Sequence, residues 1–275
     1  MTTVKLAALE NMVDSFAETP KMPALFVGHG NPMNAIEENL FVAGWRKMIE
    51  NIDKPKSIIC ISAHWETRGS YITAMDKPKT IHDFGGFPDS LYKVQYNASG
   101  DPILADLIQK TIHTGEMQLD YNWGLDHGCW SVVKQMYPKA DVPVIQLSID
   151  YTKSMSYHFN LAKELAILRR KGVLIIGSGN MIHNLRLVDW ENQHSGYEWA
   201  LEANDGFKQM ILHEEFDKLI NYKKLASSFQ LAVPTPDHYI PLLYVLGLIE
   251  KDEMTEFYND TVLMGSLSMT SVKFG

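Results

Sequence analysis

Residues 57–64 read SIICISAH, a short apolar run that ends at a histidine. A run of this length, rich in β-branched residues, is typical of a strand that is buried on both faces. PALFVG at 23–28 and GVLIIGSG at 172–179 have the same character, and each leads into a turn that contains glycine. Strands that are apolar throughout favour a mainly parallel sheet that is covered by helices on both faces.

Helical patterns lie between these strands. Residues 101–113 show an amphipathic spacing, with Asp101 placed to cap the helix and Pro102 at its first position. Further helices are expected over 34–50, 154–171, 197–220 and 236–248, and further strands over 70–75 and 142–149. This alternation predicts a single α/β domain, which we expect to span residues 22–275 after an N-terminal extension at 1–21.

Composition narrows the class of protein. The chain has 275 residues, of which 45% are hydrophobic and 21% are charged, as in an ordinary globular enzyme. A formal net charge of −8 argues against nucleic acid as a partner, because phosphate binding needs a basic surface. No apolar run is long enough to span a membrane, and the N-terminus carries acidic residues where a signal peptide needs an apolar core. We therefore expect a cytoplasmic protein.

The two cysteines fit a reducing compartment, since Cys60 and Cys129 form neither a disulfide framework nor a CxxC pair. Cys60 lies in the middle of a predicted strand, so we expect it to be buried and inert. Cys129 is close to His127 in sequence and could line a site, although simple packing is the better interpretation.

Five of the ten histidines stand where apolar segments break, each beside glycine, proline or a small residue. They are His29, His64, His127, His183 and His238. The other five lie in polar or charged stretches that are typical of solvated side chains: His82, His113, His158, His194 and His213. A lone histidine at a strand end is more often structural, but several that repeat one arrangement favour a shared site. Imidazole is the commonest metal ligand in proteins, so the pattern predicts a mononuclear metal centre.

Three of these histidines are expected at the same edge of the sheet. His29, His64 and His183 each fall past the end of a predicted strand. Parallel sheets bind their ligands beyond the carboxyl ends of the strands. His238 follows Asp237, a predicted helix N-cap, and the helix dipole there disfavours a protonated ring. A neutral ring is the form that coordinates a metal.

Other catalytic motifs do not occur in the sequence. It contains no HExxH, CxxC or GxGxxG. GSGN at 177–180 lacks the spacing and the lysine of a phosphate-binding loop. Ser178 lies between two glycines, but Ile176 occupies the first glycine position of a nucleophile elbow. A structural turn is therefore the better interpretation of Ser178.

Seven segments together resemble one known family. In chain order they are PALFVGHGNPM (23–33), SIICISAHWET (57–67), DFGGFPDSLYKVQYNASGDP (83–102), WGLDHGCWSVVKQMYP (123–138), VPVIQLSID (142–150), IIGSGNMIHNLR (175–186) and TPDHYIPLLYVLG (235–247). They resemble the 4,5-DOPA extradiol dioxygenases, a branch of the class III extradiol ring-cleavage dioxygenases, which also include the protocatechuate 4,5-dioxygenase catalytic subunit. The resemblance covers residues 22–275 and implies an α/β sheet flanked by helices, in agreement with the strand pattern.

The resemblance also implies roles for the histidines. His29, His64 and His238 match the metal ligands of the family. His238 stands where protocatechuate-type relatives are expected to have a glutamate. His183 matches the acid–base catalyst, and its place inside or beside the metal shell stays open. His127 matches a second active-site histidine that contacts substrate or dioxygen.

The implied activity is extradiol cleavage of a small catechol such as L-DOPA, with both atoms of O2 inserted at one Fe(II) ion. An all-imidazole site keeps the full charge of the ion, and it also resembles the nitrogen sites that hold zinc. We therefore expect that a purified sample can carry Zn(II), although zinc has no redox chemistry. Catechol and O2 are the expected partners. Assembly into a homo-oligomer, the natural catechol and the physiological metal are left open.

Two other functions remain open at this point. A zinc-dependent hydrolase would hold zinc and an attacking water on His29, His64 and His238, but the only nearby glutamate in sequence is Glu66. The second open function is that of a non-catalytic metal-binding protein with the same fold. Residues 82–92 contribute aromatic side chains and glycines, which suit either a mobile wall of the site or an ordinary surface loop.

Overall fold

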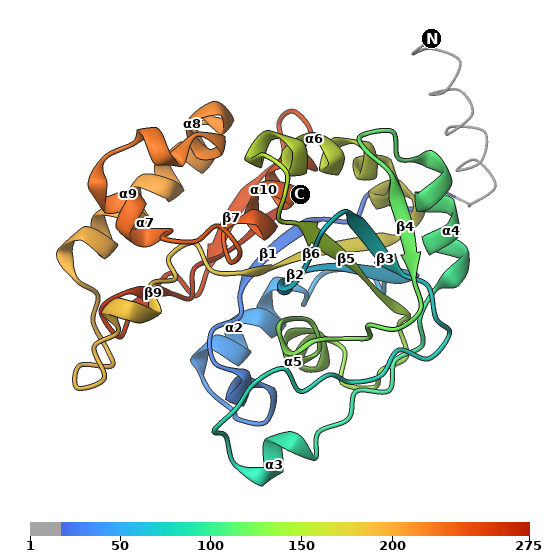
Figure 1. Cartoon of the computed structure of the whole chain (residues 1–275), viewed down its shortest axis with the longest axis horizontal. Helices are drawn as coiled ribbons and strands as arrows, with labels where there is room; N and C mark the ends of the chain where they lie inside the picture. Colours follow the sequence, from blue (N-terminus) through green and yellow to red (C-terminus); the bar gives the residue numbers. More distant parts are fainter. Residues whose placement is uncertain (1–17) are drawn as a thin grey trace.

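Eight strands form the central sheet, in the order β4-β3-β5-β2-β6-β1-β10-β7 (Figure 1). The structure is a computed structural model that describes residues 18–275, so most of the extension expected at 1–21 lies outside the described residues. The strands are β1 (Ala24–Gly28), β2 (Ser57–Thr67), β3 (Ser70–Thr73), β4 (Met117–Asp120), β5 (Val144–Asp150), β6 (Val173–Gly179), β7 (Thr255–Tyr258) and β10 (Ser271–Phe274). A short hairpin of β8 (Val262–Leu263) and β9 (Leu267–Ser268) forms a second sheet.

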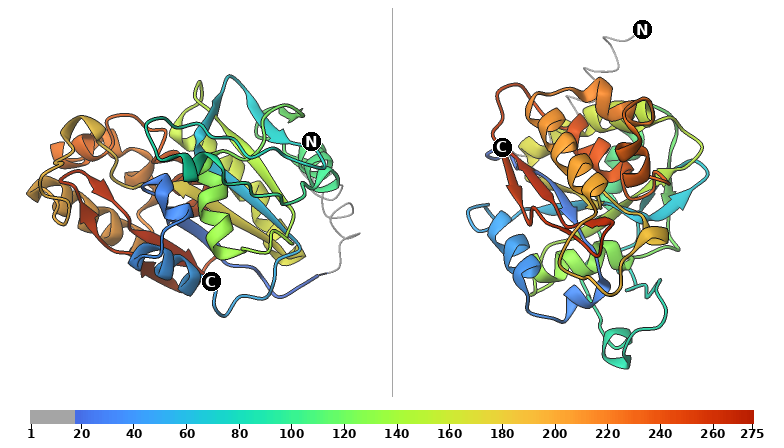
Figure 2. Two further views of the ribbon diagram at one scale, coloured as in Figure 1. Left: turned by 90° about the horizontal axis from the view of Figure 1, so that it is seen from below. Right: turned by 90° about the vertical axis from the view of Figure 1, so that its left-hand side faces the viewer.

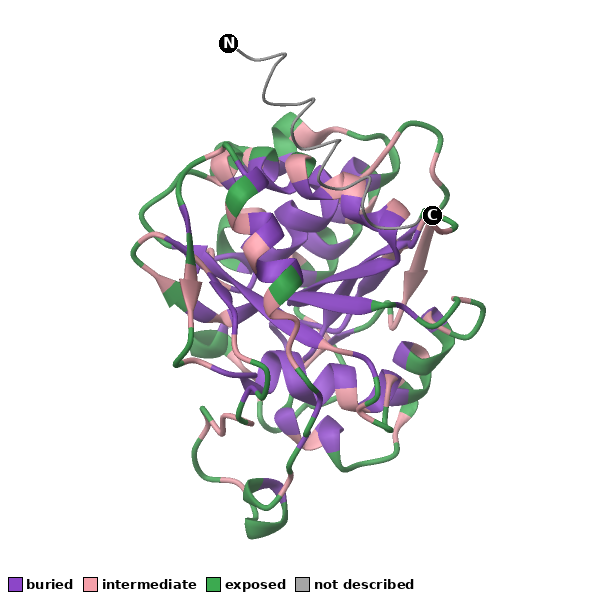
Figure 3. Ribbon diagram, turned by 90° about the vertical axis from the view of Figure 1, so that its right-hand side faces the viewer, coloured by how far each residue is buried: buried purple, intermediate pink, exposed green. Residues whose placement is uncertain are grey.

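The four central strands, β5, β2, β6 and β1, pair in parallel, as their apolar sequences predicted. Every residue of β1, β5 and β6 is buried, and Figure 3 shows this burial along the centre of the sheet. The outer strands differ, because β3 pairs with β5, β10 with β1 and β7 with β10 in antiparallel directions. The predicted fold class is confirmed, with a parallel centre and antiparallel pairs towards both edges.

Helices cover both faces of the sheet. One apolar core joins the sheet to α4, α6, α7 and α10, and the other joins it to α2 and α5 (Figures 1 and 2). The helices are α2 (Leu40–Met48), α3 (Asp89–Tyr92), α4 (Pro102–Thr111), α5 (His127–Met136), α6 (Met155–Leu165), α7 (Glu198–Leu212), α8 (Phe216–Ile220), α9 (Ser227–Ala232) and α10 (Ile240–Gly247), with 3-10 turns η1 (Pro32–Ala35), η2 (Ala166–Lys171), η3 (Leu185–Leu187) and η4 (Tyr222–Lys224). Within residues 18–275, none of the helices has the length and apolar character needed to cross a membrane.

The helices expected at 34–50 and 197–220 have different bounds in the structure. The helix expected at 34–50 begins only at Leu40, where the Asn39 side chain caps it by accepting hydrogen bonds from the first turn. The helix expected at 197–220 is interrupted between α7 and α8, where Glu214 adopts a positive φ of 53°. Residue spacing located both apolar faces, but the capping residue and the local turn decided where each helix starts and stops.

The segment around His127 forms a helix that was not predicted. α5 contains glycine, cysteine and two valines, which have weak helix propensity. Nearly all of its residues are buried against the sheet and α2, so packing outweighs propensity. The helix expected at 236–248 begins at Ile240, with Pro241 in its first turn, and the predicted N-cap Asp237 lies outside it.

β2 is longer than predicted, and a histidine lies within it. The strand continues to Thr67, and its pairing with β5 shifts register between Ile61 and Glu66. His64 therefore lies in an irregular stretch of β2 and not past the end of the strand, as the sequence had predicted. Such irregularities re-aim a side chain locally, and His64 is partly exposed between two buried neighbours.

The two cysteines behave as expected. Cys60 and Cys129 are free thiols without exposure to solvent, and both belong to the apolar core under α2 and α5. Burial raises the pKa of the Cys129 thiol well above its usual value, which keeps it in the unreactive protonated form. Packing, and not a place in the lining of a site, is therefore the role of Cys129.

Candidate metal centre

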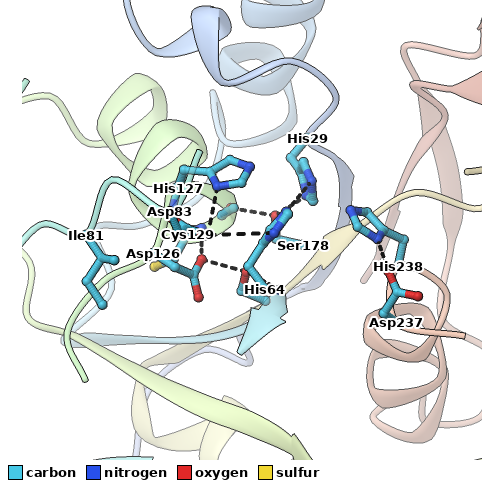
Figure 4. Close-up of polar contacts among 12 residues, drawn as sticks. His29, His64, Ile81, Asp83, Asp126, His127, Cys129, Ser178, Asp237 and His238 are labelled. Carbon is cyan, nitrogen blue, oxygen red and sulfur yellow. Dashed lines mark hydrogen bonds and ion pairs between the residues drawn. The ribbon is translucent and has the colours of Figure 1, made fainter. Parts of the chain in front are cut away.

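Three predicted ligands form a compact triangle at one end of the parallel strands (Figure 4). The ring centroids of His29 and His64 are 5.0 Å apart, those of His29 and His238 5.2 Å, and those of His64 and His238 5.0 Å. Each ring offers a nitrogen atom, and these three atoms lie within 4.8 Å of one another. His29 directly follows β1, and His238 lies in the turn before α10. The fold thus assembles the triangle from three distant segments of the chain.

The ring of His29 is held in one tautomer by a chain of hydrogen bonds. The Ser178 hydroxyl donates its only proton to the carbonyl oxygen of Gly128, at 2.6 Å. It must therefore accept from Nδ1–H of His29, which lies 3.0 Å away. Nε2 of His29 keeps its lone pair and lies 3.1 Å from Nε2 of His64. Two nitrogens that bind one ion at about 2.0–2.1 Å are roughly 3 Å apart, so this pair has the spacing of metal ligands.

His238 has a comparable outer partner. Its Nδ1 is hydrogen-bonded to the carboxylate of Asp237, which leaves Nε2 for the interior of the triangle. Carboxylates behind metal-binding histidines orient the ring in this way. The hydrogen bond from His238 also holds the pKa of Asp237 below its usual value, although burial alone would raise it. Asp237 thus contacts the His238 ring and does not cap α10, which corrects the prediction from sequence.

Electrostatics favour neutral rings at this site. Burial, followed by the neighbouring imidazoles, holds the pKa of His29 well below its usual value and lowers that of His64 to about 2. Burial also lowers the pKa of His183 to about 3. Neutral imidazole is the form that coordinates a metal. The tautomers, the spacing and the low pKa values together fit a divalent cation at the triangle.

His183 lies beside the triangle. Its ring stacks on that of His238, with centroids 3.5 Å apart and planes within 11°. It forms a second candidate cluster with His238 and Asp237, which does not include His29 or His64. The backbone N–H of His183 donates to the carbonyl of Ala232, which pins the loop after β6.

His127 borders the triangle on the other side. It is the first residue of α5, and its ring centroid lies 3.9 Å from that of His64. Its Nδ1 lies 2.9 Å from one carboxylate oxygen of Asp83, and its backbone N–H donates to the other at 2.8 Å. All five histidines that the sequence singled out therefore meet at one site.

The family model for the catalytic LigB subunit of aromatic ring-opening dioxygenase matches residues 19–275. The chain belongs to this family. It is an enzyme of the extradiol ring-opening dioxygenase type, as the resemblance implied.

Relatives of this LigB-family chain match it over most of their length. The 4,5-DOPA dioxygenase extradiol of Escherichia coli (strain K12) is 44% identical, covering 95% of this chain and 98% of the relative. The protein of the same name from Beta vulgaris is 35% identical and covers 90% and 95%. A crystal structure of an uncharacterized protein from Escherichia coli K12 is similar, with a TM-score of 0.81 and 41% identity over 93% of this chain and 100% of that one.

Several polar residues around this LigB-family site were missed from sequence. Ser178 was interpreted as a turn residue, yet it fixes the ring of His29. Asp83 was not singled out, although it lies in the DFGG segment that carried the family resemblance. Asp126, next to His127, is fully buried, and its carboxylate accepts from Ser62 at 2.6 Å while it caps α5. Asp126 precedes His127 and Asp237 precedes His238. An acidic residue directly before a candidate histidine was therefore the signal available in the sequence.

One prediction about the remaining histidines was wrong. His158 was expected to be solvated, but it is fully buried in α6, and its Nδ1 lies 3.1 Å from the hydroxyl of Tyr244 in α10. Burial lowers its pKa to about 4. The polar neighbours of His158 in sequence face solvent from other sides of the helix, so local composition gave a misleading signal.

Proposed function

We propose that this dioxygenase opens the ring of L-DOPA or a similar small catechol at one metal ion bound by His29, His64 and His238. The triangle of neutral imidazoles carries the proposal, because its inner nitrogens have the spacing of ligands and two of its rings have fixed outer partners. The names of the relatives in Escherichia coli and Beta vulgaris support the choice of substrate.

Fe(II) is the metal that we propose for activity. When bound, it would supply a Lewis-acidic and redox-active centre at which a catechol and dioxygen can react. Zinc would occupy the same nitrogen set but has no redox chemistry. We therefore expect a zinc-loaded sample to be well folded and inactive. The family match argues against the zinc hydrolase that the sequence had left open.

Two histidines outside the triangle are proposed to move protons. His183, whose ring stacks on that of His238, would take a proton from a catechol hydroxyl and return it to the opened product. His127, whose ring lies beside that of His64, would hold the ring hydroxyl or the oxygen on the opposite side. General acid–base catalysis of this kind typically contributes about 10²–10⁴ in rate.

Carboxylates near the site are proposed to offset the charge of the ion. A carboxylate ligand, such as the glutamate expected in protocatechuate-type relatives, would neutralise one charge directly, whereas His238 does not. Here Asp237 lies behind His238, and Asp83 contacts His127, so two negative charges surround the nitrogen set without binding in it. Hydrogen bonds from His127 hold the pKa of Asp83 below its usual value against the effect of burial, so its carboxylate is ionised near neutral pH.

We also propose that the protein acts in the cytoplasm. The two cysteines lie in the same apolar core as free thiols, which suits a reducing compartment.

The activity is tested by loading the metal-free protein with Fe(II) under anaerobic conditions and adding oxygenated L-DOPA, with a small panel of other catechols in parallel. We expect a yellow ring-opened product from L-DOPA, and the panel ranks the other catechols against it. Zinc-loaded protein is the control for metal chemistry. Full occupancy by iron without ring opening of any catechol would contradict the proposal.

The roles of the histidines are tested by two variants. His64→Ala should abolish stoichiometric metal binding, because it removes one corner of the triangle. His183→Gln should keep much of the metal and lose about 10²–10⁴ in turnover, the range for a positioned proton carrier. Metal analysis beside single-turnover rates separates the two cases. A His64→Ala protein that retains a full equivalent of tightly bound metal would disprove the ligand assignment.

A further inference from the structure

Residues 79–83 are tied firmly to the start of α5. The backbone N–H of Ile81 donates to the carbonyl of Leu125 at 2.7 Å, and the Leu125 N–H donates to the carbonyl of Lys79 at 2.9 Å. The indole N–H of Trp130, inside α5, donates to the carbonyl of Ile81 at 2.8 Å. These bonds hold residues 79–81 against α5, two residues before Asp83.

Two residues after Asp83, the chain reaches a pair of glycines with open space around them. A Cβ built on Gly85 or Gly86 meets no atom within 4 Å, and Gly86 has a φ of +78°. The loop beyond Asp83 projects away from the domain towards α3 (Figure 1). Phe84 turns back and packs its ring edge-on to that of His127, with centroids 5.6 Å apart. Asp83 thus lies where the chain leaves α5, just before the glycine pair.

Both carboxylate oxygens of Asp83 are hydrogen-bonded to His127. Oδ1 accepts the backbone N–H of His127 at 2.8 Å, and Oδ2 lies 2.9 Å from its Nδ1 (Figure 4). The distance from Oδ2 to Nδ1 of His64 is 3.7 Å, which is beyond a hydrogen bond. The side chain of Asp83 is 19% exposed, although the residue as a whole lies at the surface. An ionised carboxylate can only accept, so Nδ1 of His127 carries the proton.

We propose that Asp83 is a positioning residue that holds His127 as the Nδ1–H tautomer and presents its Nε2 lone pair to the substrate. This rests on the proposed function, in which a catechol binds beside His127. Figure 4 shows the second ring nitrogen of His127 on the side that faces His29. The other tautomer would place a proton at that nitrogen and remove the acceptor from the site.

The tautomer decides what His127 can do for a catechol. With the lone pair on Nε2, the ring accepts a hydrogen bond from a catechol hydroxyl, or takes its proton as the O–H bond breaks and an N–H bond forms. The resulting imidazolium would keep Nδ1–H on the Asp83 carboxylate, which stabilises its charge. The same proton can later return from Nε2 to the product. A base oriented by a neighbouring carboxylate is a recurring arrangement in enzymes.

Asp83→Asn is the variant that tests this role. The amide oxygen can still accept the backbone N–H of His127, so the start of α5 is kept. The amide nitrogen then faces Nδ1 and can only donate, which favours the Nε2–H tautomer. Asp89→Asn is the matched control. Asp89 is an exposed residue at the start of α3, and its substitution removes the same charge. Asp83→Glu keeps the carboxylate and tests rescue.

The primary measurement is nitrogen-15 NMR of the histidine rings in the zinc-loaded full-length protein, with His127 assigned by loss of its signals in His127→Gln. We expect Nδ1–H in the wild type and in Asp89→Asn, and Nε2–H in Asp83→Asn. In the iron-loaded proteins, turnover of L-DOPA by Asp83→Asn should fall by about 10² or more, with a smaller effect on KM and partial recovery in Asp83→Glu.

Three results would overturn the proposal. The first is the wild-type tautomer of His127 in Asp83→Asn, and the second is unchanged turnover in that variant. The third is the loss of one equivalent of bound metal from Asp83→Asn, which would make Asp83 a metal ligand. The NMR result does not depend on catechol turnover. If the wild-type protein opened no catechol ring, the proposed function would fail while the tautomer comparison would still decide the role of Asp83.

Discussion

At the scale of single residues, the orientation of the histidine rings depends on the groups that are hydrogen-bonded to their outer nitrogens. The five histidines were found from sequence because each interrupts an apolar segment. Their partners were harder to find, since Ser178 lies 149 residues from His29 and its small side chain has many roles in turns. The contact appears only once β1 and β6 pair in parallel and bring Val27 and Gly28 opposite Ser178 and Gly179.

Ser178→Ala tests whether the outer partner of His29 matters for metal binding. The variant frees Nδ1 of His29, so the ring can rotate or change tautomer, and we expect about a 10–100-fold loss of metal affinity. Competition with a chromophoric chelator measures it. Ser131→Ala is the control, because the Ser131 hydroxyl is buried and has no hydrogen-bond partner among the described residues. Equal affinities in the two variants would contradict the assigned role.

At the scale of elements, strands were predicted better than helix ends. Strands β1, β5 and β6 were evident because all their residues are buried and apolar. The C-terminal strands β7 and β10 were missed, since they are short and β7 is only half buried. The position of His64 was wrong in detail, because a register shift inside β2 depends on its partner β5 and leaves no mark in the local sequence.

Gly128→Ala tests the close packing of α5 on β2. A Cβ at Gly128 would lie 2.5 Å from the Ser62 hydroxyl and 2.8 Å from Cδ2 of His64. Helix propensity alone would stabilise the variant by about 1 kcal/mol. We expect the clash to prevail, with a lower free energy of unfolding and weaker metal binding. Urea denaturation and metal titration measure both. Gly85→Ala is the control, since its Cβ meets open space, and stabilisation of Gly128→Ala would contradict this account.

At the scale of the whole molecule, the site exists only in the folded chain. Its three candidate ligands come from the end of β1, the middle of β2 and the turn before α10, and the sheet must form to bring them together. Burial then holds several imidazoles in their neutral form. The same burial that prepares the ligands should make the metal-free protein sensitive to acid.

The stability of the metal-free protein should therefore fall as the pH falls. The pKa values of His64 and His183 are lowered to about 2 and about 3 from 6.5. Below pH 6.5 the unfolded chain binds protons that the folded chain does not, so folding becomes less favourable. From about pH 6.5 to about pH 5, each such histidine should lower the free energy of unfolding by up to about 1.4 kcal/mol per pH unit. Urea denaturation in the presence of a chelator measures this dependence, and constant stability across this range would contradict neutral, buried rings.

The most direct test of the central claim is the consumption of dioxygen after L-DOPA is added to the iron-loaded protein, followed with an oxygen electrode. The account predicts uptake of dioxygen in amounts equal to the L-DOPA that is opened, and none with zinc-loaded protein or with His64→Ala. Absence of uptake by protein that carries a full equivalent of Fe(II), or equal uptake by His64→Ala, would contradict a ring-opening centre at His29, His64 and His238.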